Sequence, residues 1–239
     1  MSTVDVPEPP WVRTRAPRSA PRAPLSREAI VEAALRIVDR DGLAATSMRR
    51  VADDLGVAPS ALYWHLRNKE ELLQFVLDRA IAEIRLPERD PAHWEEQFKV
   101  VGREMRRVLT MHRDIARVTL GAIPVGPNIL RVVEWIHALL REAGLPDKVV
   151  ALVGDLCGLY VGAFSYEESL GLSAPTGESL PAEEVVAMLR GYWESLPPSV
   201  FPHTLALLDY LFEGGPDERF EFGLDVIVRG IASLAADSR

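Results

Sequence analysis

The stretch VAPSALYWHLRNKEEL, residues 57–72, places three large amphipathic side chains next to one another at Tyr63, Trp64 and His65. Successive side chains of a helix point about 100° apart, so these three cannot all face one protein core. Pro59 suits the first turn of a helix, because its missing N–H needs no partner there. We therefore expect a short helix that starts at Pro59 and presents aromatic side chains to a partner outside the core.

Further helices surround this one in the sequence. Apolar residues spaced three and four apart, a serine N-cap and a glycine stop predict a helix between Ser26 and Gly42. Similar signals predict a helix between Ser47 and Gly56, one from Pro59 to about Asn68, and one from Lys69 to Arg85. Gly56 can adopt the positive φ that a tight turn between two helices requires.

A helix, a tight turn and a second short helix match the requirements of a helix-turn-helix, whose second helix lies in the DNA major groove. If Leu62 and Leu66 point inward, the other faces carry side chains that can contact DNA. Tyr63 and His65 can donate hydrogen bonds to phosphates, and the guanidinium of Arg49 can reach a guanine. The candidate DNA-binding residues are Ser47, Arg49, Ser60, Ala61, Tyr63, Trp64, His65 and Lys69. The alternative is that the adjacent aromatics are core residues of a helical bundle.

The net charge of −8 is unevenly distributed along the chain. Residues 11–69 hold 11 Arg and Lys against 6 Asp and Glu, a balance of +5, whereas residues 70–239 carry −11. A basic segment attached to an acidic body is typical of a protein whose front contacts a polyanion. The alternative is that the two segments differ by chance.

The bulk composition, 48% hydrophobic and 26% charged, is that of an ordinary globular protein. No run of about 18 apolar residues and no secretion signal are evident, so we expect a cytoplasmic protein without a membrane partner. The single cysteine, Cys157, excludes an internal disulfide and a multi-cysteine metal site. We expect it to pack as a small apolar side chain.

Residues 1–24 contain six prolines, and their basic residues are all arginines: Arg13, Arg15, Arg18 and Arg22. Such a segment cannot form a helix or a core, and we expect a disordered arm. It is either a solvated tail or a basic arm that follows DNA.

The rest of the chain reads as helices, without the alternation of period two that marks a strand, so we expect an all-α fold. The expected organisation is the arm (1–24), a helix-turn-helix domain (25–70) and a C-terminal helical domain (71–239) that binds ligand and dimerises. Long helices are expected over 147–170 and 217–236, and residues 171–181 form a loop by composition. Gly154, Gly158 and Gly162 give the first long helix a glycine face, which serves either packing within the chain, a dimer contact or ligand clearance.

Residues 26–72, SREAIVEAALRIVDRDGLAATSMRRVADDLGVAPSALYWHLRNKEEL, resemble the N-terminal domain of the tetracycline repressor (TetR) family of bacterial transcription regulators. HRDIARVTLGAIP (112–124) and RFEFGLDVIVRG (219–230) resemble segments of the regulatory domain in the subgroup that contains the tetracycline repressor itself. The resemblance implies that Arg49 reads a base, that Ser60 and Ala61 face bases, and that Tyr63, Trp64, His65 and Lys69 contact the DNA backbone. Met48 stands where that repressor has a phosphate-contacting threonine.

The resemblance also implies an effector cavity in the C-terminal half. The residues that it places around the cavity are Val101, Met105, Thr119, Ile123, Trp135 and Phe164. Methionines and aromatics on helices are often plain core residues instead. Where the tetracycline repressor has a magnesium-ligating histidine this chain has Thr119, and where that repressor has an arginine it has Ile123. We therefore expect no bound metal and no other cofactor. We expect a larger apolar or aromatic effector.

Two other classes of function were weighed. The five histidines form no HExxH motif, and neither a GxSxG elbow nor a glycine-rich phosphate loop is present, so we expect no catalysis. A DNA-binding regulator controlled by a protein partner, or by no ligand, is the second alternative. The sequence favours a homodimeric repressor that binds a palindromic operator and is released by a small effector, with the helix from Lys69 to Arg85 joining its two parts.

Overall fold

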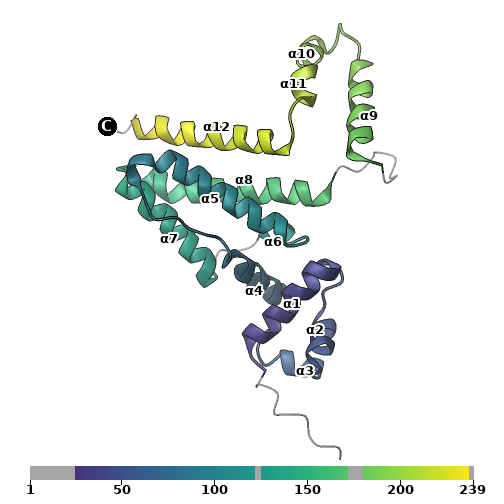
Figure 1. Ribbon diagram of the computed structural model, residues 1–239, viewed down its shortest axis with the longest axis vertical. Helices are drawn as coiled ribbons and strands as arrows, with labels where there is room; N and C mark the ends of the chain where they lie inside the picture. Colours follow the sequence, from purple (N-terminus) through teal and green to yellow (C-terminus); the bar gives the residue numbers. More distant parts are fainter. Residues whose placement is uncertain (1–24, 122–124, 172–179, 237–239) are drawn as a thin grey trace, which may run out of the picture.

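The structure is a computed structural model and describes residues 25–121, 125–171 and 180–236. Within these ranges every regular element is a helix, as the sequence predicts (Figure 1). The N-terminal helices are α1 (Arg27–Asp41), α2 (Met48–Leu55), α3 (Pro59–Leu62) and α4 (Lys69–Ile81). The remaining elements are η1 (Pro91–His93), α5 (Trp94–Met111), α6 (Ala116–Thr119), α7 (Pro127–Glu142), α8 (Asp147–Leu170), α9 (Ala182–Glu194), α10 (Pro202–Ala206), α11 (Leu208–Phe212) and α12 (Pro216–Ala236).

The first two helices begin and end at the residues that the sequence indicates. The hydroxyl of Ser26 accepts a hydrogen bond from the Ala29 amide at 3.2 Å, and Gly42 ends α1 with φ +85°. Ser47 caps α2 in the same way, and Gly56 ends it in the left-handed conformation with φ +65°. These caps satisfy backbone groups that a helix end leaves free.

Two predicted helices are too long. α3 ends at Leu62 instead of near Asn68, and residues 63–65 continue as a turn. Asn68 itself is fully extended, and its side chain accepts the Glu71 amide at 2.8 Å to cap α4. α4 ends at Ile81 instead of Arg85. The carbonyls just beyond it accept arginine side chains: Glu83 accepts Arg107 at 3.3 Å, and Ile84 accepts Arg131 at 3.0 Å.

The C-terminal half is a bundle in which α8 lies between α5, α6, α7 and α12 (Figure 1). Its core includes a ring cluster at one end of α8, where Phe164 meets Phe220 edge-on with centroids 5.1 Å apart and Tyr160 stacks on Phe220 at 5.6 Å. The Tyr160 hydroxyl donates to the Phe220 carbonyl at 2.9 Å. α12 is therefore fixed against α8 by both apolar and polar contacts.

The glycine face of α8 has two environments. A Cβ on Gly162 would lie 2.7 Å from Thr119 Oγ1, so this glycine lets α6 approach α8 closely. A Cβ on Gly158 would meet no atom within 4 Å in the described part of the chain. Packing within the chain therefore accounts for Gly162 and leaves Gly158 unexplained.

α8 is also long and apolar enough, by length and composition, to cross a membrane, which corrects the expectation that no such segment exists. Of the apolar window in this helix, 39% is buried inside the protein. Val150, Val153, Cys157 and Val161 pack in the core, whereas Leu152, Leu156 and Leu159 are exposed. The helix thus has one face in the bundle and one apolar face that no described residue covers.

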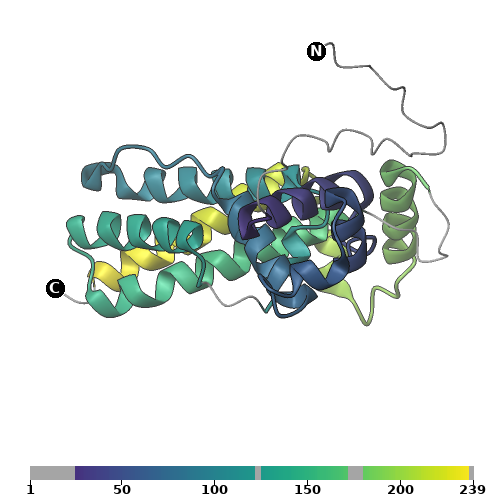
Figure 2. The same cartoon turned by 90° about the horizontal axis from the view of Figure 1, so that it is seen from below.

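Helices α9, α10 and α11 stand apart from α5 and α7 in Figure 1, and α9 does so again in Figure 2. α9 packs on α11, where Trp193 meets Phe212 edge-on at 5.7 Å. We call residues 182–212 the α9–α11 arm, which is distinct from the predicted N-terminal arm of residues 1–24. Many large side chains of the α9–α11 arm are exposed, namely Met188, Tyr192, Val200, Phe201, Leu207, Tyr210 and Leu211.

Candidate nucleic-acid interface and effector region

The turn after α3 exposes the aromatic pair that the sequence singles out. Leu62 and Leu66 are buried, as predicted, and anchor α3 and the following turn on the N-terminal core. Tyr63 is 56% exposed and Trp64 is 89% exposed, so the alternative that both are core aromatics is wrong. No other large apolar side chain of the described residues is as exposed as Trp64.

The first turn of α2 presents two arginines with different surroundings. Arg50 pairs with Asp41 at 2.6 Å and is held at the surface of the N-terminal core. Arg49 is exposed and forms no ion pair within the described residues. The guanidinium of Arg49 is therefore available to a ligand, whereas that of Arg50 already has a carboxylate partner.

The other candidate DNA-binding residues are only partly available. The Ser47 hydroxyl accepts the Arg50 amide at 3.2 Å, and Lys69 Nζ donates to the Leu43 carbonyl at 3.5 Å. Ser60 is exposed, while Ala61 and His65 are half-buried. Met48 is buried, so the residue that replaces the phosphate-contacting threonine is a core residue.

The candidate effector residues lie within the C-terminal bundle. Val101, Met105, Trp135 and Phe164 are all buried, and the Trp135 indole N–H donates to the Pro87 carbonyl at 3.0 Å. Thr119 is half-buried and donates to the Ala116 carbonyl at 2.6 Å. Ile123 lies outside the described residues. None of these residues lines the cavity described next, so their role as effector contacts stays a prediction.

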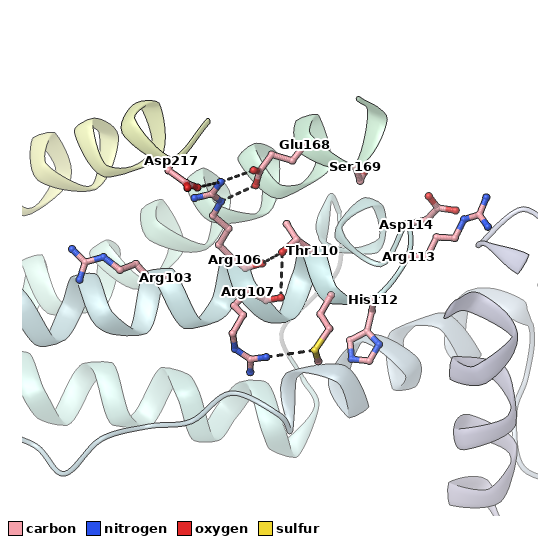
Figure 3. Close-up of a pocket in the computed structure, with 11 residues that line it drawn as sticks. Arg103, Arg106, Arg107, Thr110, His112, Arg113, Asp114, Glu168, Ser169 and Asp217 are labelled. Atoms are coloured by element: carbon pink, nitrogen blue, oxygen red, sulfur yellow. Dashed lines mark hydrogen bonds and ion pairs between the residues drawn. The ribbon is translucent and has the colours of Figure 1, made fainter. Parts of the chain in front are cut away.

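A cavity of about 700 Å³ opens beside the C-terminal half of α5 (Figure 3). Its lining is mostly charged or polar, and consists of Arg103, Arg106, Arg107, Thr110, Met111, His112, Arg113, Asp114, Glu168, Ser169 and Asp217. α5 contributes the lining residues at 103, 106, 107, 110 and 111, a spacing that puts them on one helix face. That polar stripe is visible in the sequence but is not among the predicted site residues.

Arg106 is the most constrained cation of this cavity. Its side chain, only 15% exposed, hydrogen-bonds both Glu168 oxygens and lies 2.8 Å from Asp217, as Figure 3 shows. The guanidinium also lies 4.6 Å from the centre of the Phe220 ring. The bond to Glu168 raises the pKa of Arg106 above its already high usual value. This network of charged hydrogen bonds joins α5, α8 and α12, so the guanidinium of Arg106 has a structural role.

Within the described residues, no cluster of three or more histidine, cysteine, aspartate or glutamate side chains is suited to hold a metal ion.

The chain matches two family models that together span most of its described length. Residues 30–76 match the bacterial regulatory proteins of the tetR family, and residues 86–235 match the tetracyclin repressor-like C-terminal domain. The HTH-type transcriptional repressor DrrR1 of Streptomyces coeruleorubidus is 30% identical over 96% of this chain and 85% of its own. The class A tetracycline repressor of Escherichia coli is 34% identical over 87% of this chain and 91% of its own.

Solved structures show the same relationship. Apo ActR from Streptomyces coelicolor superposes with a TM-score of 0.82 at 37% identity, covering 91% of this chain and 99% of that one. ActR in complex with actinorhodin gives a TM-score of 0.81 at 38% identity, covering 89% and 99%. The regulators of this family are not enzymes. This chain, with its exposed helix-turn-helix aromatics and its C-terminal helical bundle, therefore belongs to the TetR family of DNA-binding transcriptional repressors.

Proposed function

We propose that the protein is a homodimeric repressor that binds a palindromic operator in bacterial cytoplasm and is released by a small apolar or aromatic effector. The exposed pair Tyr63 and Trp64, together with Arg49, which forms no ion pair within the described residues, carries this proposal. An 89% exposed tryptophan is costly in water, and it sits where a second helix of a helix-turn-helix meets DNA. Residues 25–70 form the DNA-binding domain, and residues 71–239 form the effector-binding and dimerisation domain.

The DNA contacts divide into two kinds. Arg49 reads a base, with Ser60 and Ala61 facing the groove. Contacts to the backbone come from Tyr63, Trp64 and His65, together with Ser47 and Lys69 at the starts of α2 and α4. The arginine-rich residues 1–24 directly precede the DNA-binding domain in the sequence. Their positive charge strengthens DNA binding without reading bases.

The homodimer forms through the uncovered faces of α8 and α12. Leu152, Leu156 and Leu159 follow one another on one face of α8, and Phe222 and Val226 do so on α12. Apolar faces of this extent are typical of protein interfaces. Gly158 points about 120° away from this leucine face around the helix, so the leucines, not the glycine, form the proposed contact.

The effector binds among Val101, Met105, Thr119, Ile123, Trp135 and Phe164. The ActR complex with actinorhodin supports an aromatic ligand for a related bundle. Since Val101, Met105, Trp135 and Phe164 are buried, binding requires their side chains to rearrange. The effector therefore selects a conformation that differs from the unliganded one, and its preference for that conformation determines how far operator binding falls.

The test is fluorescence anisotropy of the purified chain with duplex DNA from the promoter beside its own gene, against an unrelated duplex, across a salt series. Specific binding that weakens steeply with salt is expected. Actinorhodin, as an aromatic probe, is then titrated into the complex. Equal, weak binding to both duplexes would contradict operator recognition.

A protein partner is the second candidate for the signal that releases the operator, and the α9–α11 arm (residues 182–212) favours this alternative. The α9–α11 arm has exposed apolar residues that the described chain does not cover, including Tyr192, Phe201 and Tyr210. Deleting residues 182–212 would abolish control by a protein bound there. If the same deletion leaves operator binding and its release by an aromatic compound intact, the protein-partner version is wrong.

A further inference from the structure

The turn between α5 and α6 lies against the C-terminal end of α1. α4 connects the two parts of the chain covalently, so this turn forms a second, non-covalent connection between them. This turn comprises residues 112–115, of which His112, Arg113 and Asp114 contact α1 or the segment after it. Arg113 Nη1 donates to the Arg40 carbonyl at 3.4 Å, and the other two residues make closer contacts to the same helix end. The C-terminal bundle therefore touches the DNA-binding helices directly as well as through α4.

Asp114 makes the central contact. Its Oδ2 accepts the backbone N–H of Leu43, 71 residues earlier, at 3.0 Å. A Cβ on Gly42 would lie 2.7 Å from the same oxygen, and Gly42 has φ +85°, so a residue other than glycine fits poorly there. Leu43 belongs to the segment between α1 and α2, which sets the position of α2. The carboxylate of Asp114 therefore holds the start of the helix-turn-helix.

The backbone of Asp114 is strained. It is the one non-glycine residue with positive φ, +59°, in the described part of the chain. Such a conformation costs free energy and persists where surrounding contacts enforce it, often at sites that switch. Here the contact to Leu43 is the evident enforcement.

His112 makes a second contact between the two parts. Its side chain is 8% exposed, and Nδ1 lies 3.0 and 3.1 Å from the two carboxylate oxygens of Asp39 in α1. Nε2 lies 3.5 Å from Glu83 Oε2, just beyond the end of α4. One buried imidazole thus bridges the end of α1 and the end of α4.

The turn continues directly into α6, whose last residue, Thr119, meets Gly162 on α8. Thr119 is also one of the proposed effector contacts. A ligand that displaces Thr119 must move α6, and only four residues separate Thr119 from Asp114 in the chain. The turn therefore lies on a short mechanical connection from the effector region to α1 and α2.

We propose that His112 and Asp114 form a latch that positions the DNA-binding helices relative to the bundle, and that effector binding opens it. The latch rests on the proposed function and names two positioning residues for it. When it is closed, α2 and α3 are held for operator binding. When α6 shifts, the Asp114 bond to Leu43 and the His112 bond to Asp39 break together, and the orientation of the DNA-binding helices is no longer fixed.

Three variants of the full chain test the latch. Asp114→Gly removes the acceptor and adopts the positive φ without strain, so the turn keeps its path. Asp114→Asn tolerates the same φ and keeps a side-chain oxygen, so it should restore the bond. Glu142→Gln is the matched control, because Glu142 pairs with Arg89 within the C-terminal half and contacts no DNA-binding helix.

Two measurements are made on each variant: amide hydrogen exchange at Leu43, and operator affinity in the absence of effector. In Asp114→Gly we expect Leu43 to exchange about tenfold faster and operator affinity to fall about tenfold, with the dimer intact. In Asp114→Asn and Glu142→Gln both quantities should stay within about twofold of the wild type. Rescue by Asp114→Asn separates a specific bond from general loosening.

The latch is overturned if Asp114→Gly matches the wild type in both measurements, or if Glu142→Gln loses affinity equally. A wild-type chain that binds no specific duplex would overturn the proposed function instead. In that case the exchange of Leu43 still decides whether Asp114 holds the segment between α1 and α2.

Discussion

Asp78 of α4 accepts hydrogen bonds from both Asn128 and Ile129 backbone amides at 3.0 Å, and thereby caps α7 from another helix. Its second oxygen accepts the Asn128 side-chain amide at 2.8 Å. A Cβ on Gly126 would collide with this carboxylate, so the glycine is required for the approach. The carboxylate is only 8% exposed and sits at the positive end of the α7 dipole. α4 and α7 are thus joined by one buried charged group.

Asp78→Ala should lower the free energy of unfolding by about 3 kcal/mol, because it leaves two buried backbone N–H groups without an acceptor. Asp78→Asn keeps one acceptor oxygen and should cost less, about 1 kcal/mol. Urea unfolding followed by circular dichroism measures both. Asp147→Ala, at a 79% exposed carboxylate, is the control and should change stability little. Equal losses in the Asp78 and Asp147 variants would contradict the capping role.

Trp64→Ala should weaken operator binding by at least about tenfold without destabilising the fold. The side chain is 89% exposed, so its removal leaves no cavity, and surface substitutions of this kind change stability by about 0.5 kcal/mol or less. Anisotropy titrations and thermal melts of the same preparation separate the two effects. Leu130→Ala, at a half-exposed apolar residue of α7, should leave DNA binding unchanged. A lowered melting temperature for Trp64→Ala would indicate a structural role instead.

Arg49→Ala and Arg50→Ala form a matched pair within one turn of α2. Losing Arg49 should reduce binding to the operator by about 10- to 100-fold and binding to an unrelated duplex much less, because a guanidinium that reads a base supplies discrimination. Losing Arg50 should affect both duplexes similarly, since Asp41 already occupies its guanidinium. Competition titrations at fixed salt measure the specificity ratio. If the ratio of operator binding to binding of the unrelated duplex falls equally in the two variants, Arg49 is not the base-reading residue.

The helices were predictable where local chemistry sets their ends. Ser26, Ser47, Gly42 and Gly56 are cap residues whose role follows from side chain and backbone freedom alone, and the structure confirms them. The inward direction of Leu62 and the exposure of its aromatic neighbours also follow from helical spacing.

The remaining features depend on residues distant in the chain. Beyond the early end of α4, arginines of α5 and α7 donate to the carbonyls of Glu83 and Ile84, and no local signal reveals these contacts. The Arg106 network and the contact between Asp114 and Leu43 join segments that only the fold brings together. The α9–α11 arm and its exposed apolar residues were not predicted either, because the sequence of one chain does not indicate which apolar face stays uncovered.

Cys157 should resist thiol reagents in the native state. Burial raises its pKa to about 12, so at pH 8 only about one thiol in ten thousand is ionised. In the unfolded chain the pKa is about 8.5, so the native state retains the proton that the unfolded state loses as the pH rises. Stability should therefore fall by about 1.4 kcal/mol per pH unit from about pH 9 towards pH 12 through this group.

Cys157→Ala isolates that contribution, because alanine does not titrate. The difference in unfolding free energy between wild type and variant should narrow as the pH rises above about 9. Labelling by a disulfide reagent at pH 8, with and without urea, gives an independent check. Fast labelling of the native protein would contradict the burial of this thiol.

Leu156→Glu should convert the dimer into a monomer and abolish operator binding. Leu156 is 53% exposed at the middle of the uncovered face of α8, and a carboxylate there would be buried without a partner if two copies met on this face. Leu130→Glu, at a 50% exposed leucine of α7, is the matched control and should stay dimeric. Sedimentation velocity measures the mass of each variant. If Leu156→Glu remains a dimer, the two copies associate through another surface. The exposed residues of the α9–α11 arm are then the next to substitute, because they form another large apolar area that the described chain leaves uncovered.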